Sequence, residues 1–196
     1  MIKNNISKLL SADSPFFTLS SIQTFFDITR ESARTTASRL VKRGILIRLH
    51  RDLYTLVNRK YSLFSLANAV FQPSVISLET ALNYWGLTVQ VPQVIFSIGM
   101  GSYHCEVDNT EFVFRRMNPS LFRFGQVKAE DFYIVEPEKA LLDTLYMKSK
   151  GLVELLPEDV DMNKLDEELL EFYTRHYPTI VKNSLRYFKN QEYEAK

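Results

Sequence analysis

Residues 16 to 57 contain two short helical patterns, a two-residue break between them, and two apolar runs that follow. Ile22, Phe25 and Phe26 share one face of the first pattern. Thr18 or Ser20 can cap its start, because a hydroxyl accepts hydrogen bonds from the free amides of a first helical turn. Helices this short can bury their apolar faces only against each other and the following strands, which predicts a small helix-helix-hairpin unit.

The second helical pattern begins after Thr29, which can cap it, and stops at Gly44, where a left-handed residue is favoured. Small and aliphatic side chains form its apolar face: Ala33, Ala37, Leu40 and Val41. The two alanines let this helix cross its predecessor at short range, as the two helices of a helix-turn-helix do.

The other side of this second helix is polar and cationic. At about 100° per residue, this side and its flanks carry Ser32, Arg34, Thr35, Ser38, Arg39 and Lys42. Hydroxyl, guanidinium and ammonium groups donate hydrogen bonds to phosphates and base edges. We therefore predict that these six residues contact DNA.

A hairpin is predicted from two apolar runs, 45 to 49 and 53 to 57, joined through polar residues 50 to 52. Its tip carries Arg48 and Arg51, which we predict to be further DNA contacts. A helix in the major groove beside a cationic hairpin is the arrangement of a winged helix-turn-helix. The alternative is a basic amphipathic helix and an ordinary hairpin whose charges only solvate the surface.

Charge is divided unevenly along the chain. Residues 1 to 60 contain eleven Lys or Arg and four Asp or Glu, a net charge of +7, whereas residues 61 to 196 contain thirteen and nineteen, a net charge of −6. Attraction to phosphate depends on local positive charge, so the first part suits DNA although the whole chain carries only +1. The break predicts two domains, a winged helix-turn-helix at 1–60 and a second domain at 61–196.

Composition predicts a cytoplasmic protein that does not enter a membrane. Apolar residues make up 45% of the chain and charged residues 24%, as in ordinary globular proteins. The N-terminus has no signal-peptide pattern, and no apolar run approaches the ~20 residues that a membrane span needs. A single cysteine, Cys105, excludes an intramolecular disulfide and agrees with a reducing compartment.

The second domain is predicted to be α+β. Apolar runs between Val89 and Glu136 predict strands, with a turn at Asp108 and Asn109 and a strand over 122–127. Helical patterns begin at Ser77 and Glu136, and two more follow in the last thirty-odd residues. We expect an antiparallel sheet followed by C-terminal helices.

No catalytic, metal or cofactor motif is visible, so we do not expect an enzyme. The histidines, His50, His104 and His176, are too far apart in sequence to form a local zinc or nucleophile pattern. His104 and Cys105 are adjacent, and neighbours on a strand point to opposite faces. Arginines interleaved with phenylalanines at 112–124 leave RNA or anion binding open, although such alternation is also typical of a half-buried sheet.

Three sequence blocks resemble the AbiEi-type antitoxins, the regulators of type IV toxin-antitoxin systems. The blocks are RLVKRGILIRLHRDLYTL at 39–56, PSVISLETALNYWGL at 73–87 and EPEKALLDTLY at 136–146. The resemblance covers about residues 16–150. One departure is Leu53, where these proteins often have glycine before the Tyr-x-Leu strand; the preceding Asp52 tolerates a turn.

The resemblance implies a transcriptional repressor that binds inverted repeats in the double-stranded DNA of its own promoter. It also implies that the second domain counters a nucleotidyltransferase-like toxin. We expect a monomer or weak dimer that pairs on DNA. Four residues lie in the matching second-domain motifs: Ser77, Glu79, Lys139 and Asp143. Either they contribute to neutralisation, or they are structural, with Ser77 as a helix cap and Asp143 bonded to backbone or to a basic neighbour.

A competing hypothesis is a protein-interaction module. In that case the winged helix docks a protein partner and shows no specific DNA binding.

Overall fold

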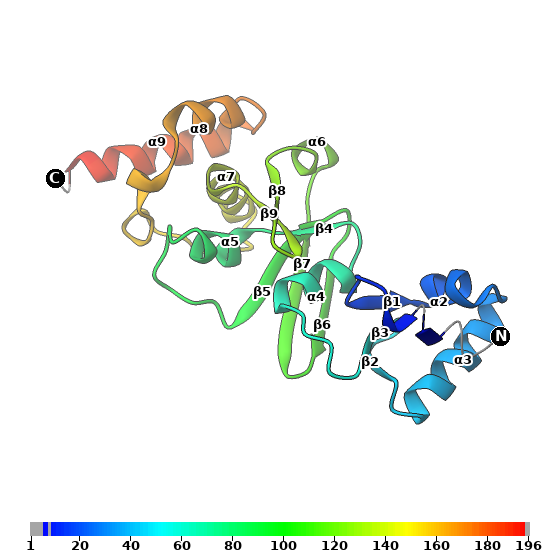
Figure 1. The fold of residues 1–196 in the computed structure, drawn as a ribbon. Helices are drawn as coiled ribbons and strands as arrows, with labels where there is room; N and C mark the ends of the chain where they lie inside the picture. The colour runs from blue at the N-terminus through cyan, green and yellow to red at the C-terminus, as the bar shows by residue number, and fades with distance from the viewer. Residues whose placement is uncertain (1–5, 8, 195–196) are drawn as a thin grey trace. The chain divides into compact units, whose positions relative to one another are not determined.

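The structure, a computed structural model, describes residues 6, 7 and 9–194 (Figure 1). The chain divides into two units, Met1–Val70 and Phe71–Lys196. The division falls later than the expected boundary at residue 60, because the chain beyond it still packs on the first unit: the ring centroids of Tyr61 and Phe16 are 5.1 Å apart. Residues 61–70 carry no charge, so the two units keep net charges of +7 and −6.

The first unit combines short helices with a three-stranded sheet. Its elements are β1 Phe16–Thr18, α2 Leu19–Phe26, α3 Arg30–Lys42, β2 Leu46–His50, β3 Leu53–Leu56 and α4 Leu63–Val70. The strands are ordered β1-β3-β2, and both pairs are antiparallel. The two helices and the hairpin thus lie where the sequence patterns predict them.

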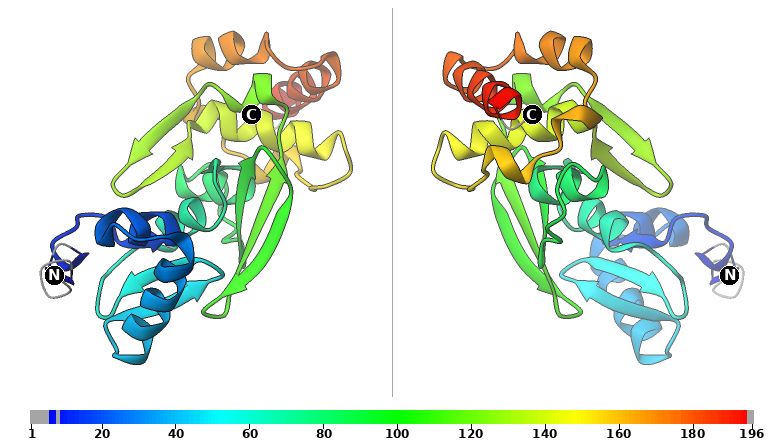
Figure 2. Two further views of the ribbon diagram at one scale, coloured as in Figure 1. Left: turned by 90° about the vertical axis from the view of Figure 1, so that its right-hand side faces the viewer. Right: turned by 90° about the vertical axis from the view of Figure 1, so that its left-hand side faces the viewer.

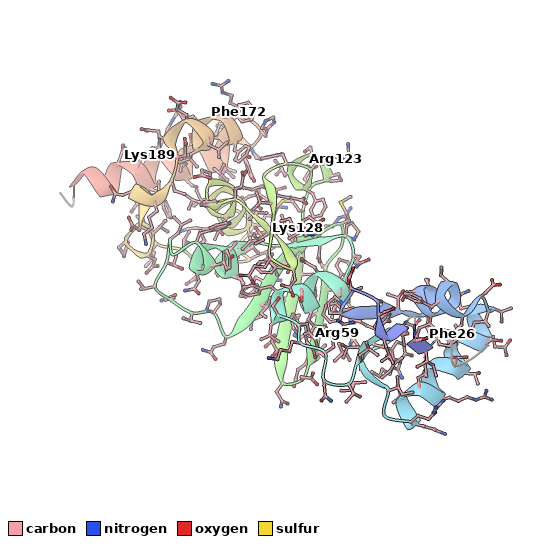
Figure 3. The ribbon with its side chains drawn as sticks, in the orientation of Figure 1. Phe26, Arg59, Arg123, Lys128, Phe172 and Lys189 are labelled. Atoms are coloured by element: carbon pink, nitrogen blue, oxygen red, sulfur yellow. The ribbon has the colours of Figure 1, made fainter. Side chains whose placement is uncertain are left out.

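Thr18, and not Ser20, caps α2. The Thr18 hydroxyl accepts from the Ser21 amide at 3.1 Å, and the Ser21 hydroxyl accepts from the Thr18 amide at 2.7 Å. Asp27 ends the helix in a left-handed conformation, with φ of 51°. Phe26, at the end of α2, is labelled in Figure 3.

The core of the first unit lies between α2, α3 and the sheet. Ala33 and Ala37 are fully buried in it, as their spacing predicts. Larger buried side chains surround them: Leu9, Phe17, Leu19, Ile22, Leu40, Leu46, Tyr54 and Leu56. The small alanine side chains permit the close crossing of α2 and α3.

The second unit is built on a six-stranded sheet. Its strands are β4 Ser74–Ile76, β5 Val94–Gly99, β6 Tyr103–Val107, β7 Thr110–Arg116, β8 Gln126–Ala129 and β9 Phe132–Val135. Its helices are α5 Leu78–Tyr84, α6 Pro119–Phe122, α7 Pro137–Lys148, α8 Glu167–Thr174 and α9 Thr179–Glu194, with 3₁₀ turns η1 Pro157–Asp159 and η2 Met162–Lys164.

The sheet is mixed, and the expectation of an antiparallel sheet was wrong in two pairs. The strand order is β6-β7-β5-β4-β9-β8, in which β5 pairs with β7 and β4 with β9 in parallel. β6 and β7 form a hairpin, and β7 lies next to β5 because β6 takes the sheet edge. Asp108 and Asn109 make the hairpin turn with φ of 49° and 60°, the left-handed pair that a type I′ turn requires.

The strand expected over 122–127 is instead the end of α6, a turn and the start of β8. Asn118 caps α6 by accepting from the Ser120 amide at 3.1 Å. Pro119 then occupies the first helical position, where a missing N–H is harmless. The run 122–127 therefore contains the last residue of a capped helix and a turn at Gly125 before β8 begins.

α7 lies at the centre of the helical layer. It packs against α5, α8 and α9, and Glu138 to Leu145 are all buried. In the views of Figure 2 these helices gather at one end of the second unit, and the β6-β7 hairpin extends away from α8 and α9. Across the described residues, we find no helix with both the length and the apolar character of a membrane span.

Candidate nucleic-acid interface

The start of α3 is fixed by a side-chain cap. Thr29 Oγ1 accepts from the Ser32 amide at 3.3 Å and donates to Ser32 Oγ at 3.1 Å. The cap leaves the proton of the Ser32 hydroxyl available as a donor. Gly44, with φ of 66°, follows the C-terminus as the sequence predicts.

All six predicted contact residues of α3 are exposed: Ser32, Arg34, Thr35, Ser38, Arg39 and Lys42. Thr35 donates to the carbonyl of Glu31 at 3.3 Å, one turn earlier. The side chains of Arg34, Arg39 and Lys42 form no hydrogen bond or ion pair with another described residue. Three cations of one helix are therefore not neutralised within the described chain.

Spacing places these groups on a continuous strip. Thr35, Arg39 and Lys42 are separated by four and three residues, so they follow one face of α3. Arg34 and Ser38 form the neighbouring row. The 13 residues of α3 give a helix about 20 Å long at 1.5 Å per residue.

The β2–β3 hairpin closes through Arg51 and Asp52 without a glycine. The register of the two strands shifts between Arg48 and His50. Arg48 Nε donates to the carbonyl of Arg51 at 2.5 Å, so its side chain crosses the tip and braces it. Arg51 is exposed. The departure from glycine at Leu53 therefore leaves the hairpin intact.

An ion pair joins the start of α3 to the hairpin tip. Arg30 Nη2 lies 3.3 Å from Asp52 Oδ2, with both side chains substantially exposed. The contact places the first residue of α3 beside the hairpin tip. Arg30 and Asp52 were absent from the sequence-predicted set, since no spacing rule relates charges so far apart in sequence.

His50 is the titratable group of the hairpin. Burial lowers its pKa below the usual value of 6.5, and the nearby charges of Arg51 and Arg48 lower it further. His50 is consequently neutral at physiological pH in the free protein, and the positive charge of the tip comes from the arginines.

The second-unit motif residues do not form one site. Ser77, Lys139 and Asp143 form a buried network: Lys139 Nζ donates to Asp143 Oδ1 at 2.8 Å and to Oδ2 at 2.9 Å. The Ser77 hydroxyl donates to Asp143 Oδ2 at 2.9 Å. Ser77 occupies the N-cap position of α5 but makes no side-chain cap bond, so its expected role as a cap was wrong.

Tyr177 completes this network, and no sequence pattern indicated it. Its hydroxyl donates to Asp143 Oδ1 at 2.6 Å. Burial raises the Tyr177 pKa well above its usual value of 10, and the charge of Asp143 adds to the increase. Lys139 Nζ also lies 4.8 Å from the centroid of the Phe124 ring. The network fastens α5, α7 and the segment before α9 to one another.

Glu79 lies apart from the network on α5. Its Oε2 atom is buried without a hydrogen-bond partner among the described residues. Burial raises its pKa above the usual value of 4.5, while its own backbone amide and Arg115 lower it to a smaller extent. No group of three or more His, Cys, Asp or Glu side chains within the described ranges could hold a metal ion.

A basic groove lies between α8 and α9. Arg175, Lys182, Arg186 and Lys189 line it with a single acidic residue, Glu171. Lys189, labelled in Figure 3, pairs with Glu167 at 2.8 Å. The last two helices are therefore basic along this groove, although acidic residues begin α8.

Together the two units define an α+β protein with one antiparallel and one mixed sheet. No model of a known protein family matches the chain, and no curated protein matches it. Among solved structures, the crystal structure of the RV2827C protein from Mycobacterium tuberculosis is similar over 93% of this chain and 74% of that chain. The TM-score is 0.56 and the identity 13%, so the likeness concerns the fold alone.

Proposed function

We propose that the first unit is a winged helix-turn-helix and that the chain is a DNA-binding repressor of its own gene. In this proposal α3 is the recognition helix and the β2–β3 hairpin is the wing. The order β1-α2-α3-β2-β3 supports it, because the hairpin directly follows the second of two crossing helices.

The observation that carries the proposal is the unneutralised cationic strip of α3. Arg34, Arg39 and Lys42 are exposed and unpaired within the described chain, on a unit with a net charge of +7. A helix fits the major groove, about 12 Å wide, and exposed cations beside it attract phosphates by releasing counterions. Exposed hydroxyls on the same helix add donors for base edges.

The resemblance to the AbiEi-type antitoxins supports the finer proposal. We propose that two copies bind inverted repeats in their own promoter, with recognition helices about 34 Å apart. The second unit then counters a nucleotidyltransferase-like toxin encoded beside this chain. The buried Ser77–Lys139–Asp143 network supports a structural role for that motif, because its side chains offer no surface to a toxin.

A gel-shift titration tests DNA binding. The full chain is titrated against the DNA upstream of its own gene at two salt concentrations, with a scrambled duplex of equal length as competitor. Specific binding that weakens steeply with salt is the expected result. Binding equal to that of the scrambled duplex would overturn the repressor proposal and favour a winged helix that docks a protein.

Toxin neutralisation needs a separate test. The chain is co-expressed with the nucleotidyltransferase-like product of an adjacent gene, and growth is compared with that of cells expressing the toxin alone. Rescue by a variant unable to bind DNA would place neutralisation in the second unit. Loss of rescue in that variant would assign both activities to the first unit.

A further inference from the structure

A pocket of about 440 Å³ opens in the second unit. It lies between α5, the segment 88–94 that leads into β5, and the segment 154–159 that contains η1. Pockets that hold small ligands commonly have volumes of about 300–1,000 Å³. This space therefore suffices for one long side chain and part of its backbone.

The lining of the pocket is apolar and negatively charged. Leu82, Phe96 and Leu155 contribute apolar surface. Three lining residues carry carboxylates, Glu79, Glu154 and Asp159, and none of the described lining residues is Lys, Arg or His. An apolar wall with acidic groups fits a cation at the end of an aliphatic stem, the form of an arginine or lysine side chain.

One carboxylate oxygen of Glu79 accepts no hydrogen bond from the described residues. Its Oε2 atom is buried without a partner, whereas nearly all buried polar atoms in folded proteins have one. Arg115 acts on Glu79 electrostatically, but burial outweighs that effect and raises the Glu79 pKa. A cation entering the pocket would favour the ionised Glu79 carboxylate, and Oε2 would bond it once the carboxylate turns toward the pocket.

Two valines beside the pocket are exposed to solvent. Val89 is 94% exposed and Val91 is 71% exposed, and Val91 also lines the pocket. An occupant restricted to the pocket would leave Val89 uncovered. A polypeptide that inserts one side chain would place its neighbouring residues over both valines.

We propose that this pocket receives an arginine or lysine side chain of a protein partner, and that apolar residues beside that side chain cover Val89 and Val91. The cation pairs with Glu79, Glu154 and Asp159, and its stem packs on Leu82 and Phe96. This inference concerns the second unit alone and does not depend on DNA binding.

Peptide titrations of the full-length chain test the proposal. Amide chemical shifts are followed by NMR during addition of acetyl-Leu-Arg-Leu-amide, the neutral acetyl-Leu-Gln-Leu-amide, or capped arginine without flanking residues. The expected order of affinity is Leu-Arg-Leu, then capped arginine, then Leu-Gln-Leu. The shifts should concentrate in α5 and in residues 88–94.

Variants separate the contribution of the Glu79 carboxylate from that of the exposed Val89 and Val91. Glu79→Gln should weaken binding of the arginine peptide about tenfold or more, as expected for loss of a charged hydrogen-bond partner. In a Val89→Ser and Val91→Ser double variant, the affinity for the arginine peptide should fall to the affinity for capped arginine. Glu106→Gln, an exposed carboxylate on β6, should leave binding unchanged and serves as the charge-matched control.

Three results would overturn the proposal. Equal binding of the arginine and glutamine peptides would show that charge does not select the occupant. Equal binding of capped arginine and the tripeptide would show a site for a free small cation and not for a protein. An absence of shifts in α5 and residues 88–94 at millimolar peptide would show that the peptide does not bind this pocket. The Trp85 fluorescence of each variant verifies folding.

Discussion

Lys139 and Asp143 lie one helical turn apart on α7, form an ion pair of 2.8 Å, and are both fully buried. A buried pair contributes little relative to apolar residues of similar size, but loss of one partner leaves a charge without compensation. Ser77 and Tyr177 satisfy the remaining bonding capacity of the carboxylate. The network therefore links the start of α5 to α7 through buried hydrogen bonds.

The buried pair gives a stability prediction. Asp143→Asn should lower the free energy of unfolding by about 3 kcal/mol, because the buried ammonium of Lys139 loses its counterion. Urea unfolding followed through Trp85, the single tryptophan, measures the change. A Lys139→Met and Asp143→Leu double variant should recover much of the loss. If Asp143→Asn has the same urea midpoint as the wild type, the pair does not stabilise the fold.

Gly125 provides a second stability prediction. Its φ is 61°, and a Cβ atom there would lie 2.6 Å from Lys139 Cδ and 3.2 Å from Lys139 Cβ. Gly125→Ala should therefore cost about 3 kcal/mol, the left-handed strain of about 1–2 kcal/mol plus the displacement of a held side chain. The measurement is again the urea midpoint.

Gly151→Ala is the matched control for Gly125→Ala. Gly151 has a φ of 69°, and a Cβ atom there would meet nothing within 4 Å. Its substitution should cost only the backbone strain of about 1–2 kcal/mol. Equal destabilisation of the two variants would contradict the proposed contact with Lys139.

Local patterns predicted much of the first unit. The Thr29 cap, the alanine face of α3 and the Gly44 stop depend on residues close in sequence, so helical spacing reveals them. The Arg30–Asp52 pair was not predictable, because it depends on how the hairpin folds back toward α3.

The second unit was harder to predict, because its main features join distant segments. Lys139 and Asp143 have the spacing of a solvent-exposed pair on a helix surface, and only the packing of α5, α8 and α9 around α7 buries them. The parallel β5–β7 pairing depends on β6 occupying the edge. The pocket beside Glu79 combines three segments that no motif relates.

Glu79 gives a pH-dependent prediction. The pKa of Glu79 is raised in the folded chain above its usual value of 4.5. As the pH rises past this value, the unfolded chain loses its Glu79 proton before the folded chain does. The free energy of unfolding therefore falls until the pH has passed the pKa of the folded chain. Glu79→Gln removes this loss and should stabilise the chain by about 1 kcal/mol at pH 7. At pH 4 the gain should largely vanish. Urea titrations at the two pH values measure it, and a destabilised variant at pH 7 would contradict the burial argument.

The proposed role of α3 in DNA recognition gives a prediction about salt. Arg39→Ala with Lys42→Ala should weaken operator binding and reduce the slope of log affinity against log salt by about 2, for the loss of two phosphate contacts. Gel shifts at several salt concentrations measure the slope. Lys60→Ala with Lys128→Ala removes two exposed cations outside α3 and the hairpin. An equal effect of the two pairs would indicate that only net charge matters.

Asp52 gives a prediction of opposite sign. Its carboxylate lies at the hairpin tip, 3.3 Å from Arg30. If DNA binds there as proposed, the carboxylate repels phosphates and holds a guanidinium that DNA would otherwise attract. An exposed pair of this kind contributes only about 0.2–1 kcal/mol to folding. Asp52→Asn should therefore leave the urea midpoint nearly unchanged while it tightens operator binding several-fold and steepens the salt dependence.

Asp13→Asn is the control for this variant, because Asp13 is an exposed carboxylate of the first unit outside α3 and the hairpin. It makes the same charge change, so a gain shared by both variants would come from net charge alone. Weaker binding by Asp52→Asn would mean that the ion pair positions the tip, and Arg30→Ala should then weaken binding equally. Tighter binding confined to Asp52→Asn would locate a phosphate between Arg30 and the hairpin tip, where α3 begins.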